Sequence, residues 1–65
     1  MMFNKITIIA DSNDQNGFMF IDSCIDHRRD KTPVSFDNGK YYVKKIIKHK
    51  NGEYTIILVP DLTMI

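Results

Sequence analysis

Two Asn-Gly dipeptides, Asn38-Gly39 and Asn51-Gly52, constrain the fold of this chain more than any other feature. Each lies between runs rich in β-branched and aromatic residues. Asn-Gly favours the two-residue type I′ turn of a β-hairpin, because that turn needs two central residues at positive φ. The sequence therefore predicts two consecutive antiparallel hairpins between Pro33 and Val59.

Two-residue loops at both turns predict which residues face each other, with Phe36 opposite Tyr41, Ile47 opposite Ile56 and Ile46 opposite Ile57. Side chains alternate between the faces of a sheet, and the two registers agree on the faces of the shared strand. One predicted face carries Val34, Phe36, Tyr41, Val43, Ile47, Tyr54, Ile56 and Leu58. The other carries Ser35, Tyr42, Lys44, Ile46, Lys48, Thr55, Ile57 and Val59.

Lys45 is the residue that fits this pattern badly, because it falls on the apolar face, where a bulge or an edge position would accommodate it. A helix over residues 41–49 is the alternative, since Tyr42, Val43, Ile46 and Ile47 also recur at helical spacing before a possible Gly cap. The β-branched and aromatic residues of this run favour the strand.

The rest of the chain is also predicted to be mostly β. Ile, Val and Thr supply 17 residues, against one Ala, two Leu and one Glu. Strands are expected over residues 3–10 and 17–25, a polar turn over 11–16, a charged loop over 26–32, and a short closing strand over 62–65 after Pro60. Residues 1–65 are thus predicted to form one small antiparallel β-barrel or meander of about five short strands, SH3-like or OB-like in architecture.

Length and composition exclude several classes of protein. A 65-residue chain leaves little room for a cofactor pocket, and a single cysteine excludes a disulfide framework within the chain. The longest apolar runs, residues 18–21 and 56–59, are too short to span a bilayer, and no signal peptide is expected. A cytoplasmic protein without a membrane partner is predicted.

Two residue groups could carry chemistry. Asp11, Asn13, Gln15 and Asp22 match positions 1, 3, 5 and 12 of a calcium loop, but position 6 lacks its Gly, so a plain turn is favoured. Cys24 and His27 form a Cys-x-x-His pair, yet a lone Cys in an apolar run is usually a packed core residue. We predict no catalytic, cofactor-binding or metal-binding residues, and no enzymatic activity.

The distribution of charge is more informative than the net charge of +1. Residues 1–37 carry six Asp against four Lys or Arg, whereas the stretch from Lys40 to Lys50 carries five Lys and no acid. Lysines around an exposed aromatic residue can contact phosphates and bases, although lysines on a sheet are also ordinary solvation and edge protection. The predicted partner-binding residues are Tyr42, Lys44, Ile46, Lys48 and Lys50, with Arg28 and Arg29 as a second contact point that could instead pair with nearby aspartates.

The functional prediction is a non-enzymatic binding protein, monomeric or homodimeric, that docks on a host protein and inhibits or modulates it. Phe, Tyr, Met, Ile, Asn and Lys fill 33 positions while Gly, Ala, Arg and Pro fill eight, a bias typical of the AT-rich genes of phages and mobile elements. The protein would then act in the host cytoplasm. The alternative is a nucleic-acid-binding barrel that uses the basic strand from Lys40 to Lys50.

Overall fold

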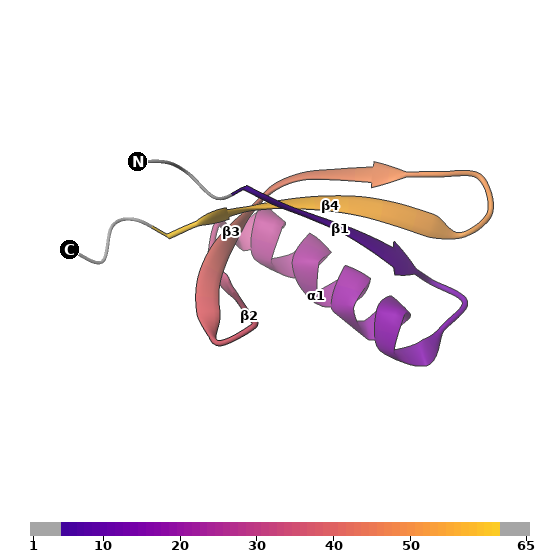
Figure 1. The fold of residues 1–65 in the computed structure, drawn as a ribbon, viewed down its shortest axis with the longest axis horizontal. Helices are drawn as coiled ribbons and strands as arrows, with labels where there is room; N and C mark the ends of the chain where they lie inside the picture. Colours follow the sequence, from indigo (N-terminus) through magenta and orange to yellow (C-terminus); the bar gives the residue numbers. More distant parts are fainter. Residues whose placement is uncertain (1–4, 62–65) are drawn as a thin grey trace.

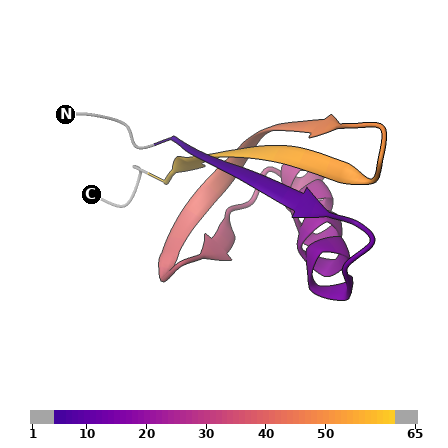
Figure 2. The same cartoon turned by 45° about the vertical axis from the view of Figure 1, so that its right-hand side comes forward.

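The computed structural model describes residues 5–61 and contains four strands and one helix (Figure 1). In chain order these are β1 (Ile6–Asp11), α1 (Gln15–Asp30), β2 (Val34–Phe36), β3 (Gly39–Lys48) and β4 (Glu53–Pro60). The strands form one antiparallel sheet in the order β1-β4-β3-β2. Figures 1 and 2 show the sheet curling as a half-barrel, with α1 against one of its faces.

The prediction of a small, mostly β domain is confirmed, but an SH3-like or OB-like identity is not. Within residues 5–61, β1 and β2 are the two edges of an open sheet and do not pair with each other. The short closing strand predicted over residues 62–65 lies outside the described residues. The alternative helix over residues 41–49 is excluded, because this segment lies in β3 and the loop that follows it.

The predicted strand over residues 17–25 and the charged loop over 26–32 are wrong, because most of this segment is α1. The Asp14 carboxylate caps the helix by accepting a hydrogen bond from the Gly17 N–H at 3.0 Å. Lys31 ends it in the left-handed conformation, with φ at 61°. The buried residues of the helix are Ile21 and Cys24. They are three positions apart, and residues three or four apart lie on the same face of a helix, so both side chains reach the core.

The first hairpin turns one residue earlier than predicted. Asp37 and Asn38, with φ of 50° and 63°, occupy the two positive-φ positions, and Phe36 pairs with Gly39. Tyr41 therefore lies opposite Val34 and not opposite Phe36 as predicted. A shift of two residues in register keeps every side chain on its predicted face, so the face assignment of β2 is correct.

The second hairpin has a longer loop than predicted, and this changes the faces. The His49 N–H donates to the Glu53 carbonyl at 2.8 Å, so residues 50–52 form a three-residue loop with Gly52 at a φ of 90°. Ile46 consequently pairs with Ile56, where the two-residue loop would have paired Ile46 with Ile57. A one-residue shift moves Ile46 and Ile47 to the opposite faces from those predicted.

A contact from another part of the chain accompanies this longer loop. The Ser12 N–H and Oγ both donate to the Gly52 carbonyl at 2.8 Å, and Asn13 Nδ2 donates to the Asn51 carbonyl at 3.3 Å. The turn after β1 thus holds the tip of the second hairpin. This long-range contact could not be derived from the hairpin sequence alone.

The bulge expected near Lys45 is present in β3. The register with β4 shifts between Val43 and Lys45, so Lys44 is the extra residue and Lys45 lies opposite Ile57. The bulge lets Val43 and Ile46 share a face although they are three residues apart. This places Lys45 away from the core.

The core lies between α1 and the adjacent face of the sheet, which we call the covered face. Its buried side chains are Ala10, Ile21, Cys24, Val34, Val43, Ile56 and Leu58. Partly buried residues packed against them are Ile6, Ile8, Phe20, Phe36, Tyr41, Ile46 and Tyr54. The apolar face predicted for the two hairpins is therefore the face that packs under α1, except that Ile46 takes the place of Ile47.

Candidate interaction surface

The face of the sheet opposite α1, which we call the uncovered face, is the candidate functional site. The strand registers place these side chains in its middle: Thr7, Ile9, Tyr42, Lys45, Ile47, Thr55, Ile57 and Val59. In the part of the chain that the structure describes, α1 is the one helix, and it packs against the covered face (Figure 2). The uncovered face is therefore open to a partner.

The apolar residues of this face are neighbours across the strands. Ile9, Thr55 and Ile47 form one row across β1, β4 and β3, and Thr7, Ile57 and Lys45 form the next. Val59 and Tyr42 pair in a third row. Ile9 is 60% exposed, the highest value among the large apolar residues that are described, while Ile47, Ile57 and Val59 are half-buried.

The charges around this apolar centre are separated along the strands. Lys45 lies in the central row with Lys44 next to it in the bulge, and both are exposed. Lys40 extends from the β2–β3 hairpin, where its Nζ donates to Ser35 Oγ at 2.8 Å. At the opposite end of the face Asp11 pairs with Glu53. The end of the face near Tyr42 is thus basic, whereas Asp11 and Glu53 lie at the end where β1 finishes and β4 begins, beside the hairpin loop that carries Lys50.

The predicted partner-binding residues of β3 do not share one face. Tyr42 is on the uncovered face, whereas Ile46 is packed against the core and Lys48 pairs with Tyr54 on the covered side. Lys44 is the bulge residue, and Lys50 lies in the hairpin loop. The prediction of a continuous Lys44–Ile46–Lys48 surface is wrong, because it depended on the register of a two-residue loop.

The second predicted contact point, Arg28 and Arg29, lies in the last turn of α1 and not in a loop. Arg29 pairs locally with Asp26 at 3.3 Å and with Asp30 at 3.4 Å, the alternative that the sequence had left open. Arg28 is exposed. Basic residues at this end of a helix also interact favourably with its dipole.

Sequence reasoning missed four residues of the uncovered face: Thr7, Ile9, Lys45 and Ile47. The signal for Ile9 is the segment Ile6-Thr7-Ile8-Ile9, which is apolar on both faces of a strand and so cannot bury all its residues under one helix. Ile47 and Lys45 could be assigned only with the bulge and the loop length known.

Cys24 is buried in the core, and His27 contacts a neighbouring side chain. Cys24 is fully buried, and desolvation raises the pKa of its thiol to about 11. His27 Nδ1 lies 2.8 Å from Thr32 Oγ1, a contact that joins the end of α1 to the segment after it. A thiol with this pKa is protonated at neutral pH, which is the opposite of what an activated nucleophile requires.

The acidic and amide side chains between β1 and α1 make turn contacts. Asp11 Oδ1 accepts from the Asn13 N–H at 2.9 Å, and Asp14 caps the helix. Asp22, the last position of the possible calcium loop, lies in α1. Among residues 5–61 no three His, Cys, Asp or Glu side chains gather as a metal site would require.

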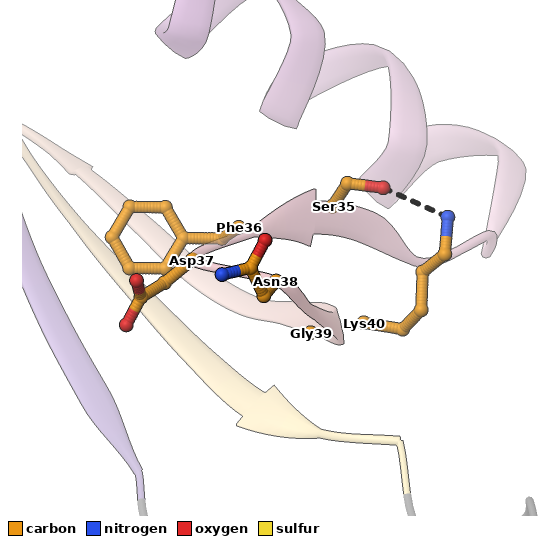
Figure 3. Close-up of a pocket in the computed structure, with 6 residues that line it drawn as sticks. All are labelled: Ser35, Phe36, Asp37, Asn38, Gly39 and Lys40. Carbon is orange, nitrogen blue, oxygen red and sulfur yellow. Dashed lines mark hydrogen bonds between the residues drawn. The ribbon is translucent and has the colours of Figure 1, made fainter.

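A hollow at the β2–β3 hairpin is lined by Ser35, Phe36, Asp37, Asn38, Gly39 and Lys40 (Figure 3). All six residues belong to one turn and its flanks. In Figure 3 the hydrogen bond from Lys40 to Ser35 lies at one side and Phe36 at the other. This hollow has no polar group from a second element directed into it, so we do not assign it a ligand.

No protein-family model, curated protein or solved structure matches the chain. Within residues 5–61 no helix is both long and apolar enough to cross a membrane.

Proposed function

We propose that this chain is a non-enzymatic binding protein that docks on a host protein through the uncovered face and modulates its activity. The observation that carries the proposal is an apolar sheet face, with Ile9, Ile47, Ile57 and Val59, that the helix leaves open. Contiguous exposed apolar surface on a small domain is typical of an interaction site. The bias toward residues with AT-rich codons supports a phage or mobile element as the source of the gene.

The arrangement of charge supports a partner with an apolar patch and acidic surroundings. Apolar residues occupy the middle of the uncovered face, and Lys40, Lys44 and Lys45 lie toward one end. An apolar centre with a charged rim is the usual anatomy of a protein–protein interface. Acidic groups on the partner would complement these lysines and favour the correct orientation on encounter.

The environment of Cys24, the candidate nucleophile, supports the proposal that the protein is not an enzyme. Cys24 is buried with a raised pKa, and His27 contacts Thr32. A binding protein of this kind acts by surface contact and requires no turnover.

Affinity capture from host lysate with matched variants tests the proposal. Ile57→Asp places a charge at the centre of the uncovered face, and Met19→Asp places one on α1, where Met19 is 59% exposed. We expect the wild type and Met19→Asp to retain the same host protein and Ile57→Asp to lose it, because a charge in a desolvated interface centre is costly. Circular dichroism checks that both variants are folded.

Tyr42→Ala provides a second, milder variant of the same face and should weaken capture at least about tenfold if Tyr42 is a contact residue. If Ile57→Asp and Tyr42→Ala are both folded and retain the partner fully, the uncovered face is not the docking site. Arg28→Glu would then test the exposed end of α1.

Nucleic-acid binding is a second candidate, and one observation favours it. Tyr42 is on the uncovered face, and Lys40, Lys44 and Lys45 belong to the same strand, so lysines surround an aromatic ring on an open sheet. Such a surface can stack a base and neutralise phosphates. Binding would weaken steeply with salt, and Lys44→Ala and Lys45→Ala would each lower the salt slope by about one unit. No retention on mixed DNA and RNA at low salt would exclude this candidate.

A further inference from the structure

The two edges of the sheet differ in how they are protected from pairing with another chain. At one edge, β2 is only three residues long and pairs with the first residues of β3. The rest of β3 is also an edge, and it carries a bulge at Lys44 and the exposed residues Lys45 and Lys48. Short strands, bulges and lysines are the features that keep natural sheet edges from pairing. At the other edge, β1 has none of these between Ile6 and Ala10.

The outer edge of β1 presents free backbone hydrogen-bonding positions. The Ser12 N–H bonds to the Gly52 carbonyl, in register with the pairing of β1 and β4. Hydrogen-bonded and non-bonded pairs alternate along an antiparallel ladder, so Ile6, Ile8 and Ala10 direct their backbone groups toward β4. Thr7 and Ile9 therefore direct theirs outward.

We propose that β1 pairs antiparallel with β1 of a second copy of this chain, about a two-fold axis at Ile8. Thr7 of each copy then lies opposite Ile9 of the other. Both residues direct their backbone groups outward, so the two copies exchange ladder hydrogen bonds at each Thr7–Ile9 pair. The two sheets become one continuous sheet of eight strands. A C2 pairing of this kind closes and does not extend into a fibre.

Charge complementarity selects this register. Lys5 immediately precedes β1 and Asp11 ends it, and pairing about Ile8 places Lys5 of each copy opposite Asp11 of the other. Asp11 Oδ1 accepts from the Asn13 N–H, which leaves Oδ2 for the incoming lysine. A shift of two residues either way would face Lys5 with Ile9, or Asp11 with Thr7, and would lose both ion pairs.

The pairing also covers the most exposed apolar residue of the sheet. Ile9, at 60% exposure, gains Thr7 of the second copy as a cross-strand neighbour on the uncovered face. Side chains keep their faces in this register, because residues 7 and 9 are both on the uncovered face and residue 8 of each copy is on the covered face. The uncovered faces of the two copies would then form one surface. This inference does not depend on the identity of the host partner.

Sedimentation equilibrium of the full chain tests the proposal. The wild type should form a dimer, and Thr7→Pro, which removes an outward N–H without affecting a bond to β4, should raise the dissociation constant at least about tenfold. Ile57→Asp is the matched control, since Ile57 lies on the uncovered face of β4, one strand in from the edge, and the change leaves the outward backbone groups of β1 intact, so the dimer should be unchanged. The charge reversal Lys5→Asp should raise the dissociation constant of the dimer up to about tenfold. The double variant Lys5→Asp with Asp11→Lys should restore the wild-type value.

Amide hydrogen exchange on the wild type provides a readout that does not depend on a variant. Thr7 and Ile9 amides should become protected as the protein concentration rises, while Ile6 and Ile8 amides are protected at all concentrations. A wild type that stays monomeric at about 1 mM would overturn the proposal. So would a dimer in which the Thr7 and Ile9 amides exchange freely, or one that Ile57→Asp dissociates, because the interface would then be the face of the sheet.

Discussion

Cys24 is the residue whose environment most directly limits the chemistry of the chain. It is fully buried between α1 and the sheet, and desolvation raises the pKa of its thiol to about 11. The thiol packs as a small apolar group. Its position in the core explains why a lone cysteine in an apolar run is better interpreted as a packing residue than as a nucleophile.

This raised pKa predicts a loss of stability at high pH. The pKa of Cys24 is about 11 in the folded chain against an ordinary value of 9.0, so between these pH values the unfolded chain releases a proton that the folded chain keeps. The free energy of unfolding should therefore fall as the pH rises from about 9 to about 11, with no contribution at lower pH. Urea unfolding of the wild type and Cys24→Ala at several pH values measures the effect as the difference between the two proteins.

The comparison with Cys24→Ala cancels every contribution to stability that the two proteins share. A difference between the two proteins that stays constant from pH 7 to 11 would contradict the assignment. A thiol reagent should also react slowly with the native protein at pH 8, at the rate of local opening.

Gly17 gives a second residue-scale prediction, in which packing opposes helix propensity. A Cβ at Gly17 would overlap the carbonyl oxygen of Asp11, where the first turn of α1 lies close to the end of β1. Ala is the better helix former by about 1 kcal/mol, yet Gly17→Ala should destabilise the fold by about 1–3 kcal/mol, because backbone must shift to make room. Chemical denaturation measures this.

Ser23→Ala is the control for Gly17→Ala, since Ser23 is exposed on the same helix and the change should stabilise slightly. An increase in stability from Gly17→Ala would show that β1 and α1 can separate without cost.

At the scale of the elements, the position of β3 depends on two local irregularities. The bulge at Lys44 and the three-residue loop at residues 50–52 together set which of its isoleucines packs under α1. Ile46 joins the core cluster, and Ile47 faces away from it, opposite Thr55. A two-residue loop without a bulge would exchange these two residues.

Alanine substitution at the two neighbouring isoleucines tests this register. Ile46→Ala should cost about 1–3 kcal/mol of unfolding free energy, because Ile46 packs against the core. Ile47→Ala should cost less than about 1 kcal/mol, since its side chain packs only against residues of the uncovered face. Equal losses, or a larger loss at Ile47, would contradict the register of β3. By the same reasoning Ile46→Asp should unfold the domain.

For the molecule as a whole, the limiting fact is that one helix covers only one face of a four-stranded sheet. The domain has two layers, with core side chains contributed by all four strands and by α1. The second face keeps Ile9 exposed and Ile47, Ile57 and Tyr42 half-buried. A chain this small has one helix among its described residues and cannot cover both faces of the sheet with it. Burial of the second face therefore requires a partner, which is the role given to the proposed host protein.

Coupling between dimerisation and stability is the prediction at this scale. If β1 pairs with a second copy, the melting temperature should rise with protein concentration, because association stabilises the folded state by mass action. Ile9→Lys places a charge in the middle of the edge and should make the melting temperature independent of concentration. Differential scanning calorimetry over a hundredfold range of concentration measures both. A concentration-independent wild type would contradict the coupling.

Much of the β structure could be derived from local sequence. Asn38 and Asn51 lie at the tips of the two hairpins. The alternation of apolar and polar residues from Val34 to Leu58 gives the faces of the sheet except from Lys44 to Lys48. These features depend on neighbours a few residues apart, so turn chemistry and side-chain alternation are sufficient to predict them.

Helix α1 was not predicted, because its signals are weak locally. Phe18, Phe20, Ile21 and Ile25 resemble a strand when considered alone, and Gly17 interrupts the first turn. The segment becomes a helix because Ile21 and Cys24 can then bury their side chains against the sheet, with caps at Asp14 and Lys31. Tertiary packing overrides local preference here.

By itself, the sequence determined that this chain forms hairpins with an alternating apolar face. The tertiary structure decided which residues of β3 are available to a partner, because the loop at Gly52 is held by Ser12 and Asn13, about forty residues earlier. It also decided that β1 is an unprotected edge, since strand order depends on the β1–β4 pairing across the whole chain. Side-chain periodicity acts over a few residues, whereas register, strand order and face coverage depend on contacts between segments far apart in the sequence.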